Sequence, residues 1–140
     1  MTDLTIVGKV PKGLDEPAVR ALAAAAFESE GADPSRVSIS FTDAATIHDL
    51  NRRHRGQDRP TDVLSYPFDV SFPQGGGGEV VVCPDVVTRL ADADGREPVR
   101  AFKEAIVHGL LHVLGHEDET EQGAEEMDRR TRSILKASNG

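Results

Sequence analysis

His108 and His112 lie four residues apart in a strongly apolar stretch of this 140-residue sequence. On a helix, residues at this spacing face the same side, so both imidazoles could bind one tetrahedral metal ion. The alternative is a pair of ordinary core histidines. Each buried imidazole would then need its own partners for the ring nitrogens, which makes two on one apolar helix hard to explain by packing alone. The pair therefore predicts a metal centre on a buried helix.

The third ligand should come from just beyond Gly115, where the candidates are His116 and Asp118. A glycine often follows the last residues of a helix, so we expect the helix to end at Gly115. Such a helix cannot hold three converging rings, whereas Asp118 can fold back from the following loop. Asp118 could instead cap the last helix together with Glu121. The open three-ligand geometry of catalytic zinc favours Asp118 as a ligand.

The segment from His108 to His112 differs from the H-E-x-x-H motif of zinc proteases at one position, where Gly109 replaces the glutamate. That glutamate is the general base of these proteases, so peptide hydrolysis by this route is disfavoured. Glu104 precedes His108 by one helical turn and could orient its ring from outside the ligand set. A solvated or ion-paired Glu104 is an equally good interpretation.

Hydrophobic periodicity predicts the elements that position these residues. The stretch 98–114 is apolar on almost all sides, which is typical of a buried helix. The run Gly75–Gly78 lacks the Lys-Ser/Thr of a phosphate-binding loop, so we expect a mobile connection there. We therefore predict one α+β domain over residues 1–140, with a small mixed four-stranded sheet packed around the metal-bearing helix and surrounded by further helices. The expected strands are 2–9, 36–41, 62–66 and 79–83, and the expected helices are 15–31, 43–53, 84–95, 98–114 and 120–135.

Composition limits the classes of function. Cys83 is the only cysteine, which excludes an internal disulfide and a zinc site built from several thiolates. The net charge of −8 opposes binding of nucleic acid across the whole surface, so any such contact must be local. The apolar stretches are too short to cross a bilayer, and no signal peptide is recognisable at the start. We expect a soluble, cytoplasmic and monomeric protein.

Three segments resemble a known family. Residues 108–118, H-G-L-L-H-V-L-G-H-E-D, are similar to the H-G-x-L-H-L-x-G-[YH]-D-H signature of the bacterial YbeY endoribonucleases. Residues 50–67, L-N-R-R-H-R-G-Q-D-R-P-T-D-V-L-S-Y-P, resemble the family's L-N-x-x-Y-R-G-x-D-x-P-T-D-V-L-S-F-P segment. Residues 78–83, G-E-V-V-V-C, resemble its G-D-I-V-I-C strand. The order and spacing of the segments agree from about residue 37 onwards.

The resemblance implies a metal-dependent endoribonuclease that acts on single-stranded RNA in ribosomal RNA maturation and ribosome quality control. The implied partners are an rRNA precursor and the small ribosomal subunit, and the implied cofactor is one divalent ion, with zinc expected. Arg55 matches the family's functional arginine and could grip a phosphate in a bidentate manner. Arg52, Arg53 and Arg59 are expected to be solvated charges or to steer RNA.

Two positions depart from the family pattern. Asp118 replaces the usual third histidine, and His54 replaces a common tyrosine. Carboxylate is a harder ligand than imidazole, so the site could admit divalent ions other than zinc. Two other functions stay open at this point. A metallohydrolase of another substrate, such as a peptidase, would need a carboxylate base, and a non-catalytic ribosome-associated module would need a fourth protein ligand that closes the metal site.

Overall fold

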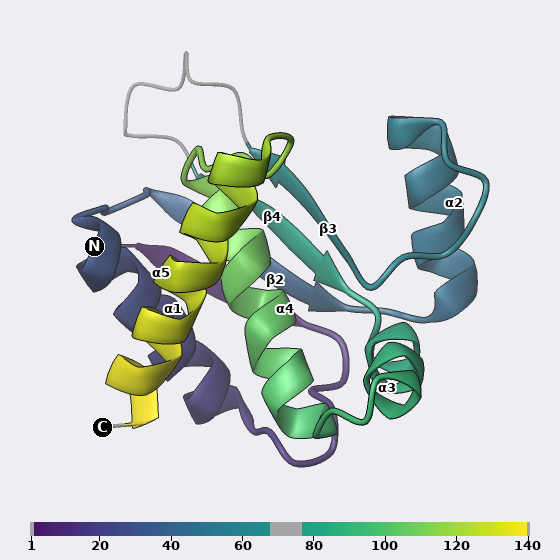
Figure 1. Cartoon of the computed structure of the whole chain (residues 1–140), viewed down its shortest axis with the longest axis horizontal. Coiled ribbons are helices and arrows are strands. Elements are labelled where there is room, and N and C mark those ends of the chain that lie inside the picture. The colour runs from purple at the N-terminus through teal and green to yellow at the C-terminus, as the bar shows by residue number, and fades with distance from the viewer. Residues whose placement is uncertain (1, 68–76, 140) are drawn as a thin grey trace.

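The computed structural model describes residues 2–67 and 77–139, and the strands in this part of the chain form one mixed sheet (Figure 1). Three neighbouring strands are parallel, and the strand at the edge next to them runs antiparallel. The α+β class and the mixed four-stranded sheet predicted from the sequence are therefore confirmed. In spatial order the strands are β1 (Asp3–Val7), β2 (Arg36–Phe41), β4 (Gly77–Val82) and β3 (Val63–Pro67).

The helices begin and end at residues that favour helix termini. The Asp15 and Asp43 carboxylates accept hydrogen bonds from the first-turn N–H groups of two helices, and left-handed Gly31 and Gly56 end the same two helices. No helix in the described part of the chain is long and apolar enough to cross a membrane. The helices are α1 (Glu16–Glu30), α2 (Ala44–Arg55), α3 (Pro84–Ala93), α4 (Pro98–Val113) and α5 (Glu121–Asn139).

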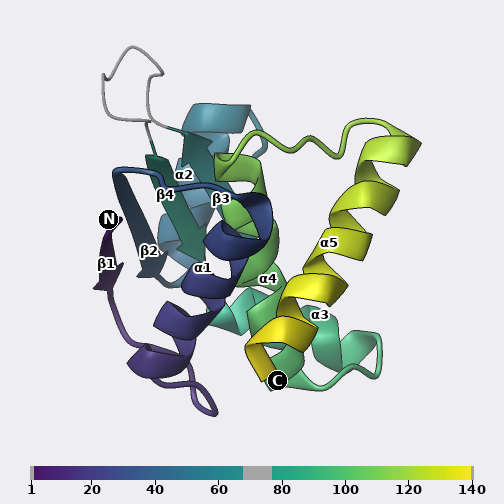
Figure 2. The same cartoon turned by 90° about the vertical axis from the view of Figure 1, so that its left-hand side faces the viewer.

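Two hydrophobic cores lie on opposite faces of the sheet. Figure 2 shows α1, α4 and α5 on one side, where Val80 and Val82 of β4 join the larger core. Val81, which points the other way because side chains alternate along a strand, packs with Ile47 of α2 in a smaller core. The larger core surrounds α4, and the smaller core holds α2 against the sheet. The two helices that carry His108, His112 and Arg55 are thus fixed to opposite faces.

The glycine run before β4 was predicted as a loop through Gly78, and this prediction was wrong at its end. Gly77 and Gly78 are the first two residues of β4 and pair with β2, whereas Gly75 and Gly76 lie outside the described residues. Glycine is required here for close packing. A Cβ on Gly77 would lie 1.8 Å from the carbonyl oxygen of Arg36, and one on Gly78 would lie 2.6 Å from that of Tyr66.

Candidate metal centre

Helix α4 carries both histidines on the side that faces a cleft, while its other sides are buried. His108 and His112 are partly exposed, and nine other residues of α4 are buried. Gly109 faces the sheet, where an added Cβ would lie 2.5 Å from Val80 Cγ1 and 3.2 Å from Ser65 Oγ. The Ser65 hydroxyl also donates a hydrogen bond to the Gly109 carbonyl, at 3.1 Å. Gly109 therefore allows α4 to pack closely on β3 and β4. A side chain at position 109, where zinc proteases carry their glutamate, would point toward the sheet and away from the histidines.

Three donor atoms from His108, His112 and Asp118 meet at the end of α4. The two histidine Nε2 atoms lie 3.1 Å apart, and Asp118 Oδ2 lies 3.2 Å from that of His108 and 3.6 Å from that of His112. Ligand atoms bound at about 2.0–2.1 Å to a tetrahedral zinc ion are about 3.3–3.4 Å from one another. The observed separations bracket this value, so the three side chains fit a tetrahedral ion. Among the described residues they form a group that could hold a metal.

The turn after α4 separates Asp118 from His116. The Gly115 N–H donates to the His112 carbonyl and the His116 N–H to the Leu111 carbonyl, each at 3.0 Å, which is a Schellman turn with Gly115 in the left-handed conformation. The turn directs the His116 ring toward Glu30 on α1, where Nε2 contacts a carboxylate oxygen. The loop therefore brings Asp118, and not His116, to the two histidines.

Asp118 is also free of the capping role that the sequence allowed. Helix α5 begins at Glu121, and the Thr120 hydroxyl accepts a hydrogen bond from the Gly123 N–H at 2.9 Å. Thr120 is thus the residue that caps α5. The Asp118 carboxylate remains available on the side of the histidines, with 39% of its side chain exposed.

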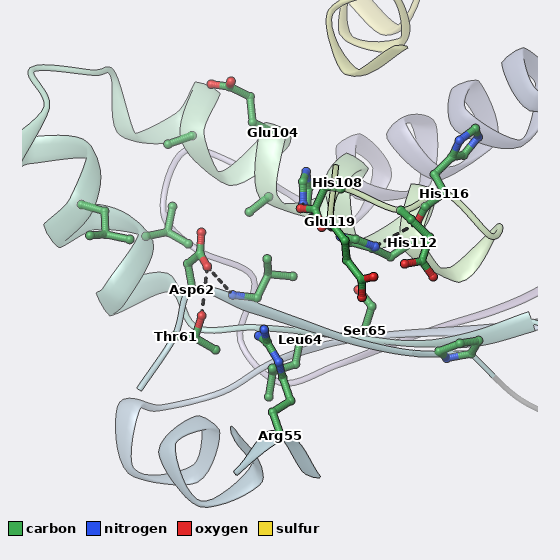
Figure 3. A pocket seen from close by; sticks show the side chains of 18 of the residues that line it. Arg55, Thr61, Asp62, Leu64, Ser65, Glu104, His108, His112, His116 and Glu119 are labelled. Carbon is green, nitrogen blue, oxygen red and sulfur yellow. Dashed lines mark hydrogen bonds and ion pairs between the residues drawn. The ribbon is translucent and has the colours of Figure 1, made fainter. Parts of the chain in front are cut away.

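The histidines open into a cleft of about 590 Å³ between α4, the loop 114–120, β3 and the end of α2 (Figure 3). Figure 3 shows the Arg55 guanidinium directed into this cleft from the β3 side. Carboxylates outnumber arginines on its walls. The charged and polar side chains that line the cleft are Arg55, Thr61, Asp62, Ser65, Arg96, Glu104, His108, His112, His116, Glu117, Asp118 and Glu119.

Arg55 differs from its basic neighbours in its partners. Arg52 and Arg53 each form an ion pair with Asp49 at 2.8 Å. Arg96, the other arginine of the cleft, lies 3.5 Å from Glu104. Within the described ranges 2–67 and 77–139, no hydrogen bond or ion pair occupies the Arg55 guanidinium. Of the two arginines that line the cleft, Arg55 is therefore the one whose guanidinium could bind an anion without first breaking an ion pair.

Almost the whole chain matches a known protein family. A family model described as Endoribonuclease YbeY matches residues 8–139. The chain belongs to the YbeY endoribonuclease family. It is 39% identical over 132 residues to the Endoribonuclease YbeY of Chelativorans sp. (strain BNC1), covering 91% of this chain and 79% of that protein. The resemblance inferred from the three sequence segments is confirmed.

The chain is also similar to a second YbeY protein and to a solved structure. The Endoribonuclease YbeY of Alteromonas mediterranea is 36% identical over 115 residues, which cover 79% of this chain and 72% of that protein. The solution structure of TM1509 from Thermotoga maritima is similar with a TM-score of 0.66 and 27% identity, covering 97% of this chain and 89% of that one. The fold is therefore shared with an experimentally solved protein over almost its whole length.

Glu104 does not take the orienting role that the sequence left open in this YbeY-family site. Its carboxylate lies 3.5 Å from Arg96 Nη1 and 3.9 Å from Arg100 Nε, and no hydrogen bond joins it to His108 within the described residues. Glu104 is ion-paired in the structure, as the alternative interpretation of the sequence predicted. His112 is oriented instead by a backbone group, because its Nδ1 lies 3.0 Å from the His116 carbonyl oxygen.

His54, which replaces a tyrosine of the family pattern, packs against β3 beside Arg55. Its ring lies 5.0 Å from that of Tyr66, with the two planes tilted by 57°. Burial and the nearby Glu79 carboxylate raise the pKa of Tyr66, while the positive charge of Arg55 opposes this shift. This aromatic pair thus packs the last turn of α2, which ends at Arg55, against β3.

Sequence reasoning missed several residues around the site. Glu117 and Glu119 line the cleft, and Glu30 and Arg130 form an ion pair behind the loop that carries Asp118. Glu30 and His116 are 86 positions apart, and Glu30 and Arg130 are 100 apart. No local pattern could have connected them, because α1 and α5 come together only in the folded chain.

Proposed function

We propose that this chain is a metal-dependent endoribonuclease that cleaves single-stranded RNA, with an rRNA precursor on the small ribosomal subunit as its substrate in the cytoplasm. One observation carries the proposal. His108, His112 and Asp118 gather their ligand atoms in the same cleft as Arg55, whose guanidinium has no hydrogen bond or ion pair to any residue that the structure describes. The relatives named Endoribonuclease YbeY support the reaction type.

His108, His112 and Asp118 would hold one divalent ion, and we propose zinc. When bound, such an ion lowers the pKa of its water and polarises a phosphoryl oxygen. The side chains of the site are suited to this role. The His112 Nδ1–H group donates to the His116 carbonyl, which leaves the lone pair of Nε2 directed at the ligand group. The Asp118 carboxylate adds an oxygen donor, so manganese and other harder ions are expected to compete with zinc.

Arg55 would bind the scissile phosphate from the opposite wall of the cleft. Its planar guanidinium can donate two parallel hydrogen bonds to one phosphate. The surrounding carboxylates, which include Asp62, Glu117 and Glu119, repel a second anion. RNA is therefore expected to enter this cleft only where Arg55 and the ligand-held cation together offset the acidic walls. Arg52, Arg53 and Arg59 would contribute a weaker, salt-sensitive attraction.

The structure weighs against the two alternative functions. A peptidase of the H-E-x-x-H type would need a carboxylate at position 109, where an added Cβ would clash with Val80. A purely structural metal is usually closed by four protein ligands, whereas the described residues offer a group of three. Three ligands leave one position for water, as in catalytic sites.

Metal analysis and RNA cleavage test the proposal together. Purified wild-type protein is expected to bind about one divalent ion and to cut single-stranded rRNA fragments, while His112→Ala loses both properties. Arg55→Ala is expected to keep the metal and lose cleavage. Cells that carry only His112→Ala or Arg55→Ala are expected to accumulate unprocessed rRNA. Normal rRNA processing in both strains would refute the nuclease function, and full metal content in Asp118→Ala would refute the third ligand.

A further inference from the structure

A largely buried carboxylate lies behind the loop that carries Asp118. Glu30, the last residue of α1, is only 7% exposed at its side chain. One of its oxygens contacts His116 Nε2, and the other accepts a hydrogen bond from Arg130 Nη1 of α5 at 2.7 Å. Burial raises the pKa of Glu30, but the hydrogen bonds from His116 and Arg130 outweigh it and hold the pKa below its usual range. Glu30 therefore joins α1, α5 and the loop 114–120 through a charged group.

The same loop residue also contacts a candidate metal ligand. His116 uses its side chain to reach Glu30 and its carbonyl oxygen to accept a hydrogen bond from His112 Nδ1 at 3.0 Å. That second bond sets the tautomer and the rotation of the His112 ring, because Nδ1 keeps the proton and Nε2 faces the other ligands. Two residues further along the loop is Asp118. A displacement of His116 would thus move two of the three ligand groups.

We propose that Glu30 is a positioning residue of the metal centre, acting through His116 on both His112 and Asp118. The inference rests on the proposed function, since it takes His108, His112 and Asp118 as ligands. A long-range anchor is needed because the loop is short and exposed, and the bonds that hold its turn, two backbone hydrogen bonds and the bond from His112 Nδ1, all come from the end of α4. Partners outside the ligand set commonly change metal affinity by about 10–100-fold when they are lost.

Arg130 has a second partner that provides a matched control. Its Nε donates to Glu126 Oε1 at 2.7 Å, one helical turn away on α5, and among the described residues no hydrogen bond or ion pair joins Glu126 to His116. Glu30→Ala and Glu126→Ala each remove one carboxylate from Arg130. Only the first also releases His116. A role of Glu30 that is confined to stabilising α5 would give the two variants the same properties.

The test measures the affinity for zinc and the absorption spectrum of the cobalt-substituted protein, together with the thermal stability of the metal-free protein. Glu30→Ala and His116→Leu are expected to bind zinc about tenfold to a hundredfold more weakly and to shift the cobalt spectrum. The double variant should be no weaker than the worse single variant, because both remove one connection. His116→Gln, which retains a donor toward Glu30, should recover part of the affinity. Glu126→Ala should bind zinc like the wild type.

Several outcomes would overturn the inference. Wild-type zinc affinity and an unchanged cobalt spectrum in Glu30→Ala would do so, and so would losses in Glu30→Ala and His116→Leu that simply add in the double variant. An equal loss in Glu126→Ala would assign the effect to α5. His112→Ala separates this inference from the proposed function. If His112→Ala also bound zinc normally, the metal centre itself would be misassigned, whereas a loss in His112→Ala alone would refute only the role of Glu30.

Discussion

Helix α4 and the loop 114–120 supply the same candidate metal centre, but different forces hold them in place. His108 and His112 take their separation from helix geometry, and α4 is fixed by the nine residues that it buries. Asp118 belongs to an exposed segment that depends on the turn at Gly115 and on the contact between His116 and Glu30. The helix thus provides a preformed pair of ligands, and the loop provides a ligand whose position depends on distant parts of the chain.

This difference has a consequence for how the site tolerates change. A helix that is buried on several sides keeps its histidines in register even when one contact is lost. A loop with few buried side chains moves readily when one of its few anchors is removed. Substitutions around Asp118 should therefore alter metal affinity gradually, whereas substitutions of the α4 histidines should abolish it.

The largest expected effect follows from His112→Ala. This change removes one ligand and also the hydrogen bond from Nδ1 to the His116 carbonyl, so it affects both regions at once. Loss of a partner outside the ligand set weakens metal binding by up to about 100-fold, and we expect the loss of this ligand to weaken zinc binding by more than that. Asp118→Ala should lose less, because the two histidines stay in register. Metal titration of the two variants measures the difference, and a greater loss in Asp118→Ala would reverse the proposed ranking of helix and loop.

Arg55→Ala tests a functional group that lies outside both regions. The Arg55 guanidinium lines the cleft, and within the described residues no hydrogen bond or ion pair joins it to His108, His112 or Asp118, so metal content should stay at the wild-type level. Cleavage of single-stranded RNA should fall about a hundredfold, as for the loss of other groups that stabilise developing charge. Arg53→Ala is the control on the same helix, since Arg53 pairs with Asp49. Equal losses in the two variants would indicate general attraction of RNA and not a phosphate grip in the cleft.

The sequence predicted the helix that carries His108 and His112 well. The spacing of His108 and His112, the apolar residues around them and the glycine that follows are local signals, and α4 extends over Pro98–Val113 against a predicted 98–114. The α+β class also followed from local periodicity. The sequence also predicts that the chain folds back after Gly115 and brings Asp118 toward the histidines, and the Schellman turn at Gly115 reverses the chain in this way.

Long-range contacts were beyond sequence reasoning. In the sequence, Glu30 is an ordinary acidic residue at the end of an amphipathic helix. Its role arises only because α5 packs beside α1 in the folded chain. The need for glycine at position 77 arises from the approach of Arg36 on the neighbouring strand, and the order of strands in the sheet was not part of the prediction. Gly109 was interpreted only as a missing base, because the sequence does not say which side of α4 faces the sheet.

Gly109→Ala tests the rigidity of the helix-based half. In an exposed helix interior, replacing glycine with alanine stabilises a protein by about 0.5–1 kcal/mol. Here the new methyl group would lie 2.5 Å from Val80 Cγ1, so we expect the free energy of unfolding to fall by about 1–3 kcal/mol. Urea denaturation of the metal-free protein measures this change. A stabilised variant would show that α4 can move away from the sheet and would weaken the contrast with the loop.

The smallest expected effect concerns α2, the peripheral helix that ends at Arg55. The exposed Asp43 caps α2, and its hydrogen bonds from Thr46, through the side chain and through the backbone N–H at 2.7 Å, lower its pKa. A carboxylate with a lowered pKa stabilises the folded state fully above its unfolded pKa of about 3.9 and loses this contribution as the pH falls through the folded value. Asp43→Ala should therefore be less stable than wild type at pH 6, with a gap that narrows below about pH 4. Urea denaturation across this pH range measures the gap, and a constant gap would mean that the charge of Asp43 does not hold α2 in place. Because α4 and its histidines do not contact this cap, metal affinity at pH 6 should be the same in both proteins.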